Sequence, residues 1–149
     1  MAAHPVTEPS RPHLGWRLLA LFYDLWPAAA MWMAVAALFL VAEGNRPLVP
    51  WSPMQWLLWI TCWGLTGMYA VASWRRGGQT LGMRPWRLRV IGTDGHAAPR
   101  PLLWVRYAVG TLSLLAGGLG FWWAWIDRDR LTWHDRASGT RLVREAKRD

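Results

Sequence analysis

The sequence predicts an all-α integral membrane protein with two transmembrane helices, a third apolar segment that spans or re-enters, and a small cytoplasmic β element. Three observations support this prediction. The 149 residues are 53% hydrophobic and only 17% charged, and most charges lie in short stretches between long uncharged ones. Fourteen residues are Trp, a side chain enriched at membrane–water interfaces. Cys62 is the only cysteine, which excludes a disulfide scaffold.

Uncharged windows of about 18 residues mark the candidate spans, because that length of helix crosses the hydrocarbon core. The first span is predicted over about 16–42, since Leu25–Ala42 carries no charge. The second is predicted over about 53–74, since Trp51–Trp74 is also uncharged. Residues 101–126 form the third apolar segment.

Basic residues predict the orientation of these spans, because they accumulate on the cytoplasmic side. The segment 75–100 contains six arginines, whereas the connector 43–50 contains only Arg46. We therefore expect a multi-pass protein whose N-terminus and 75–100 loop are cytoplasmic and whose 43–50 connector faces the other side.

The tail after Ile126 is also basic, with seven Lys or Arg residues, yet three full spans would place it outside. One solution is that Gly117, Gly118 and Gly120 break the third segment and return the chain to its starting side. The other is a true third span that overrides the charge rule. The sequence leaves both open.

Two short strands are expected on either side of the third segment. Arg87–Ile91 alternates long and β-branched residues and precedes the turn signal Thr93-Asp94-Gly95. Thr140–Val143 is the second predicted strand. If the two pair, both lie on one side of the membrane, which supports the returning topology.

Asp24 lies inside the first predicted span, where a carboxylate is costly and normally faces protein or a water-filled cavity. Arg17 shares its helix face but is about 10 Å away along the axis. Arg106, or an arginine of the 75–89 loop, is an equally good partner. Asp24 either handles a proton or cation, or forms a structural clamp between helices. Arg106 either reaches the lipid headgroups or pairs with Asp24 or Asp135.

The glycine-rich stretch after the second span carries three arginines that could contact an anionic lipid headgroup: Arg75, Arg76 and Arg84. The alternative is a tight turn whose charge only sets orientation. Membrane topology already explains the basic residues, so we expect no nucleic-acid partner. The P-loop spacing is absent.

Catalytic motifs are lacking. His134-Asp135 could form half of a metal or acid–base site, but no second cluster has ligand spacing. The sequence contains no Gly-x-Ser-x-Gly and no His-Glu-x-x-His. We therefore expect no enzyme, no catalytic residue, no metal and no cofactor.

Four pieces of the chain, in order, resemble the RDD family, named for one Arg and two Asp. They are Arg17-Leu-Leu-Ala-Leu-Phe-Tyr-Asp24, Gly78-Gln-Thr-Leu-Gly-Met-Arg-Pro-Trp-Arg-Leu-Arg-Val90 with Asp94-Gly95, Arg106, and Ala124-Trp-Ile-Asp127 with His134-Asp135-Arg-Ala-Ser-Gly-Thr140. The resemblance covers residues 13–144, between a polar tail (1–12) and a basic end (145–149). It assigns the first Asp to Asp24 and the second to Asp135, with Asp127 as its rival.

The resemblance implies a small protein of the bacterial inner membrane but no defined activity. We expect a membrane accessory or structural protein held by an intramembrane network of four residues, Arg17, Asp24, Arg106 and Asp135. The alternatives are a cation or proton transport component that uses Asp24, and an anionic-lipid binder that uses the basic loop. The expected partners are membrane lipids and either a second copy or other membrane proteins.

Overall fold

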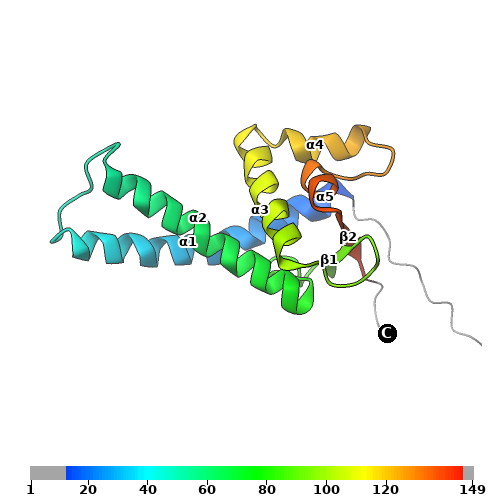
Figure 1. The fold of residues 1–149 in the computed structure, drawn as a ribbon, viewed down its shortest axis with the longest axis horizontal. Helices are drawn as coiled ribbons and strands as arrows, with labels where there is room; N and C mark the ends of the chain where they lie inside the picture. The colour runs from blue at the N-terminus through cyan, green and yellow to red at the C-terminus, as the bar shows by residue number, and fades with distance from the viewer. Residues whose placement is uncertain (1–12, 146–149) are drawn as a thin grey trace, which may run out of the picture.

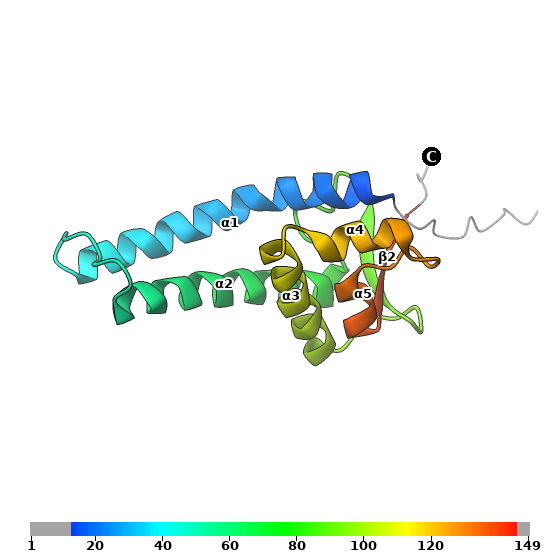
Figure 2. The same ribbon diagram turned by 90° about the horizontal axis from the view of Figure 1, so that it is seen from above.

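The computed structural model describes residues 13–145, so the predicted tail (1–12) and most of the basic end (146–149) lie outside the described part. Seven elements follow in order: α1 (Leu14–Ala42), α2 (Pro53–Gly77), β1 (Leu88–Gly92), α3 (Arg100–Leu115), α4 (Leu119–Ile126), α5 (Trp133–Ser138) and β2 (Thr140–Arg144). Helices α1 and α2 form a long hairpin, and all other elements gather at the end where α1 begins and α2 ends (Figures 1 and 2).

Helix α1 is by itself long and apolar enough to cross a membrane. Only a small part of its apolar surface is covered by protein, and side chains such as Trp26 and Met33 are exposed. A helix in the core of a soluble protein would bury such residues. The structure therefore confirms a membrane-capable helix at the first predicted span.

Helix α2 is well formed but is not confirmed as a second span. The Ser52 side chain caps its start by accepting from the Gln55 N–H, and Gly78 ends it in the left-handed conformation. However, its sequence is not apolar enough to qualify by length and composition alone. Its tryptophans and glycines add little hydropathy, because indole is half polar and glycine has no side chain.

The third apolar segment is not one straight helix. Helices α3 and α4 meet at 97° across a short break. Gly117 and Gly118 occupy the break with φ values of 70° and 80°, a conformation that glycine adopts at little cost. Together the two helices are apolar enough to count as one broken span or a re-entrant loop. A break at these glycines is one of the two alternatives that the sequence left open.

The two predicted strands pair with each other. Strands β1 and β2 form an antiparallel two-stranded sheet with Leu88 opposite Arg144 and Gly92 opposite Thr140. The main apolar core lies where this sheet meets the ends of α1, α2 and α3, and it contains Ala20, Val71, Met83, Leu88, Val90, Ala98, Leu103 and Leu142. Because this core brings α1 and α3 to the sheet, Arg17 of α1 and Arg106 of α3 reach α5.

Candidate functional site

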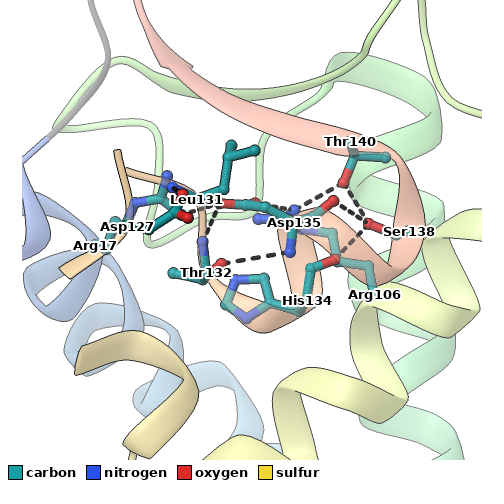
Figure 3. A network of polar contacts seen from close by, with 9 residues as sticks. All are labelled: Arg17, Arg106, Asp127, Leu131, Thr132, His134, Asp135, Ser138 and Thr140. Atoms are coloured by element: carbon teal, nitrogen blue, oxygen red, sulfur yellow. Dashed lines mark hydrogen bonds and ion pairs between the residues drawn. The ribbon is translucent and has the colours of Figure 1, made fainter. Parts of the chain in front are cut away.

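Local structure fixes Asp135 at the start of α5. The Thr132 N–H donates to Asp135 Oδ2 at 3.2 Å, and the Asp135 N–H donates to Thr132 Oγ1 at 3.4 Å. This reciprocal pair is a capping box, which satisfies backbone donors that the first turn of a helix leaves free. Asp135 therefore presents its carboxylate from a defined position (Figure 3).

Two arginines from distant helices converge on this carboxylate. Arg17 of α1 donates from Nη1 to Asp135 Oδ2 at 2.7 Å, and Arg106 of α3 donates from Nη1 to Asp135 Oδ1 at 2.5 Å. Arg106 Nη1 also donates to Thr140 Oγ1 of β2 at 2.8 Å. The side chains of Arg17, Arg106 and Asp135, here called the arginine–aspartate cluster, are 5%, 5% and 0% exposed. The cluster thus ties α1, α3, α5 and β2 together.

The electrostatics of the cluster are unbalanced. Burial alone would raise the pKa of Asp135, but the positive charges of Arg106 and Arg17 outweigh it and hold that pKa below its usual range. Asp135 is therefore an anion at neutral pH. Two buried cations share this one anion, so the cluster carries an excess positive charge, which is costly in a low-dielectric interior.

His134 lies beside the cluster (Figure 3). Its ring contacts that of Phe121, with the ring centroids 4.9 Å apart. Burial, together with the positive charge of Arg106, lowers the pKa of His134 to about 3. Its ring is therefore neutral at pH 7. The Nδ1 atom is buried and has no hydrogen-bond partner among the described residues.

Asp24 does not join the arginine–aspartate cluster. Its carboxylate accepts from the Thr80 hydroxyl, from the Gly82 N–H at 2.8 Å and from the Tyr69 hydroxyl at 3.4 Å. No Arg or Lys forms an ion pair with it within residues 13–145. The expectation that an arginine pairs with Asp24 is therefore wrong. The loop after α2 folds back against α1 and supplies uncharged donors in place of an arginine.

Gly82 allows this close approach. A Cβ at Gly82 would lie 2.6 Å from the Asp24 nitrogen and closer still to the Ala20 carbonyl oxygen. Sequence reasoning missed Thr80, Gly82 and Tyr69 as partners of Asp24. The only signal was that Thr80 and Gly82 belong to the loop stretch that resembles the family.

Asp127, the rival second aspartate, lies in a different setting. It accepts from the Leu131 N–H at 2.9 Å and pairs with the half-exposed Arg136. The hydrogen bond from Leu131 contributes most to lowering the Asp127 pKa, and Arg136 adds to this effect. The structure brings Asp135, and not Asp127, to Arg17 and Arg106.

The three arginines predicted to contact lipid headgroups have exposed side chains: Arg75, Arg76 and Arg84. Their contact with lipid stays a prediction. Within the described residues, no three His, Cys, Asp or Glu side chains lie together as a metal site would require.

A cavity of about 190 Å³ lies between α1, α2 and α3. Its polar lining includes Arg17, Arg106 and His134 near the cluster, and Asp24 further along α1. Most of the remaining lining is apolar. The arginine–aspartate cluster and the Asp24 carboxylate therefore border the same cavity.

The fold and the site define a small helical protein with a membrane-capable helix and a buried arginine–aspartate cluster at one end. The family model of the RDD family matches residues 11–139. The chain therefore belongs to the RDD family, as its motifs predicted. Comparison with curated proteins and with solved structures gave no match.

We expect Asp135→Asn to destabilise the fold by about 3–5 kcal/mol, because it leaves two buried guanidinium groups without a counter-charge. Thermal unfolding and the folded fraction after size-exclusion chromatography in detergent measure the effect. Asp127→Asn is the matched control, since its partner Arg136 is half exposed, and we expect a smaller loss. Equal losses in the two variants would contradict the central role of Asp135.

The low pKa of His134 predicts a loss of stability in mild acid. As pH falls, His134 binds a proton near pH 6.5 in the unfolded chain, but only near pH 3 in the folded chain. Stability therefore falls across that window, by about 2 kcal/mol between pH 7.5 and 5.0. We expect His134→Gln to flatten this profile in thermal unfolding. The exposed His96 gives the control variant His96→Gln, which should keep the wild-type profile.

Proposed function

We propose that this protein is a multi-pass protein of the bacterial inner membrane with a structural or accessory role, held together by the arginine–aspartate cluster. The observation that carries the proposal is that Arg17 and Arg106 both donate to Asp135. They connect segments far apart in the chain, as structural residues do. Removing Asp135 would leave two buried guanidinium groups without a counter-charge.

The charge distribution supports a cytoplasmic sheet end. Arg75, Arg76 and Arg84 follow the membrane-facing part of α2, and the sheet carries further arginines. The connector at the opposite end of the hairpin contains only Arg46. Under the positive-inside rule, the sheet and the start of α1 therefore face the cytoplasm.

We infer that α2 crosses the membrane beside α1. Its 25 residues are about 37 Å long as a helix, enough to cross the hydrocarbon core. It runs antiparallel to α1 in the hairpin (Figure 2) and exposes large side chains such as Ile60 and Met68. A helix that packs beside a spanning helix can be less hydrophobic, because part of its surface faces protein and not lipid.

Helices α3 and α4 are proposed to enter the membrane and return. Their exposed apolar side chains include Leu112, Leu115, Leu119 and Ile126. The chain enters α3 from the region of β1 and comes back to β2, which pairs with β1. A broken pair that re-enters reconciles this return with the basic tail.

Cysteine labelling tests the topology. In a Cys62→Ser background, we expect Arg46→Cys to react with a membrane-impermeant maleimide in intact spheroplasts, because the connector faces outward. Thr93→Cys, in the exposed turn after β1, should react only after the membrane is permeabilised. Labelling of Thr93→Cys in intact spheroplasts would overturn the orientation, and an unlabelled Arg46→Cys would overturn the two-span hairpin.

Asp24 supports a second candidate, a cation or proton transport component. It lines the cavity, and its hydrogen-bond donors within the described residues are uncharged. A carboxylate without a cationic partner can exchange a proton or cation more readily than one paired with two arginines. Two or three helices hardly enclose a path alone, so this function requires an oligomer.

Liposome measurements separate the two candidates. Purified protein is reconstituted with a pH-sensitive dye inside, and sodium, potassium or lithium is added. Transport predicts cation-dependent proton flux that Asp24→Asn abolishes while folding is retained. An accessory protein predicts no flux from a folded wild type and, for Asp24→Asn, mainly a lower folded yield.

A further inference from the structure

The cavity between α1, α2 and α3 has two unlike ends. Arg17, Arg106 and His134 line the end next to the cluster. Asp24 lies two helical turns further along α1, about 10 Å from Arg17 along the axis. Between them the walls are largely apolar and include Ala20, Leu21, Met83, Val90, Leu114 and Leu142.

Two buried polar atoms at the basic end have no hydrogen-bond partner among the described residues. Arg17 and Arg106 both donate to Asp135 from Nη1, so their two guanidinium groups share one carboxylate. Trp74, which also lines the cavity and packs against the Arg106 guanidinium, has a buried indole N–H without an acceptor within residues 13–145. His134 Nδ1 is likewise buried and unpartnered there. Buried polar groups of this kind normally have a partner.

The charges at the basic end of the cavity are also unbalanced. The cluster has two cations and one anion, and the neutral His134 does not change the sum. The negative charge of Asp24 lies at the far end and is held by three donors of its own. An anion at this end would accept from the Trp74 N–H, and from His134 in the tautomer that carries the proton on Nδ1, and would balance the surplus charge.

The opening of the cavity indicates what the anion is attached to. Leu21 of α1 and Leu114 of α3 line the cavity and are also exposed, so it opens between these helices on an apolar surface. A free anion would have to cross this apolar opening. An amphiphile could place its anionic group inside and leave its chains outside.

We propose that this cavity binds the phosphate of an anionic phospholipid against Arg17 and Arg106, with the acyl chains leaving between Leu21 and Leu114. The site is distinct from the exposed arginines of the loop after α2. It rests on the membrane location proposed above, but detergent solution tests it without reference to topology. About 190 Å³ accommodates a headgroup phosphate and not a whole lipid.

The test is thermal unfolding of the purified full-length chain in a nonionic detergent with added dioleoylphosphatidylglycerol. A ligand that binds the folded state raises the Tm with increasing concentration. We expect phosphatidylglycerol to act at a concentration at least tenfold lower than dioleoylphosphatidylcholine. Sodium phosphate should give no comparable shift. Equal effects of the two lipids, or of sodium phosphate and phosphatidylglycerol, would overturn the proposal.

Two matched pairs of variants locate the site. Gly110 lines the cavity and has open space around its Cβ position, so Gly110→Leu fills the cavity without an initial clash at Cβ. Gly64 of α2 also has open space but does not line the cavity, which makes Gly64→Leu its control. We expect Gly110→Leu to raise the half-maximal lipid concentration at least tenfold and Gly64→Leu to leave it unchanged.

The second pair tests charge at the opening. Leu114→Glu places a carboxylate where the lipid phosphate would pass, whereas its neighbour Leu115, which is 80% exposed, does not line the cavity. We expect weaker phosphatidylglycerol binding in Leu114→Glu than in Leu115→Glu. Both changes lie at exposed positions, so they keep the test usable if Gly110→Leu fails to fold.

The combined variant Arg75→Gln, Arg76→Gln and Arg84→Gln distinguishes this cavity from the basic loop. The proposal predicts an unchanged preference for phosphatidylglycerol in this variant. Loss of the preference there, or wild-type binding in both Gly110→Leu and Leu114→Glu, would overturn the cavity as the site. Neither result would affect the topology, which cysteine labelling tests separately.

Discussion

The carboxylate of Asp135, held between Arg17 and Arg106, is the interaction on which the sheet end of the molecule depends. Placing three charges in a buried position is costly, and only their mutual attraction and the surrounding hydrogen bonds offset it. The arrangement requires α1, α3 and α5 to adopt their positions together. The cluster therefore favours this packing over others, because a packing that separated Asp135 from both arginines would leave all three buried charges without a partner.

The two aspartates that the resemblance assigns to the family motif, Asp24 and Asp135, have different environments in this chain. Asp135 is paired with two cations and is fixed as an anion. Asp24 accepts only from uncharged donors, two of them in a loop that folds back because Gly82 permits close contact with α1. One aspartate therefore organises the fold, while the other faces the cavity between the helices.

The bend between α3 and α4 and the sheet depend on each other. Strand β2 can pair with β1 only if the apolar segment between them returns to its starting end. Gly117 and Gly118 supply the left-handed backbone that the return requires. The cluster then holds α5 and β2 against α3, since Arg106 of α3 donates both to Asp135 in α5 and to Thr140 in β2.

The sequence by itself determined the apolar α1, the two strands, the glycines at the break and the family motifs, because each depends on local composition or spacing. The sequence also indicated the polar residues of the candidate site, Arg17, Asp24, Arg106 and Asp135, but not all of their hydrogen-bond partners. Only the tertiary structure decided that Asp135 meets both arginines and that Asp24 meets Thr80, Tyr69 and Gly82. These contacts join residues 29 to 118 positions apart, and no local pattern encodes which loop folds against which helix.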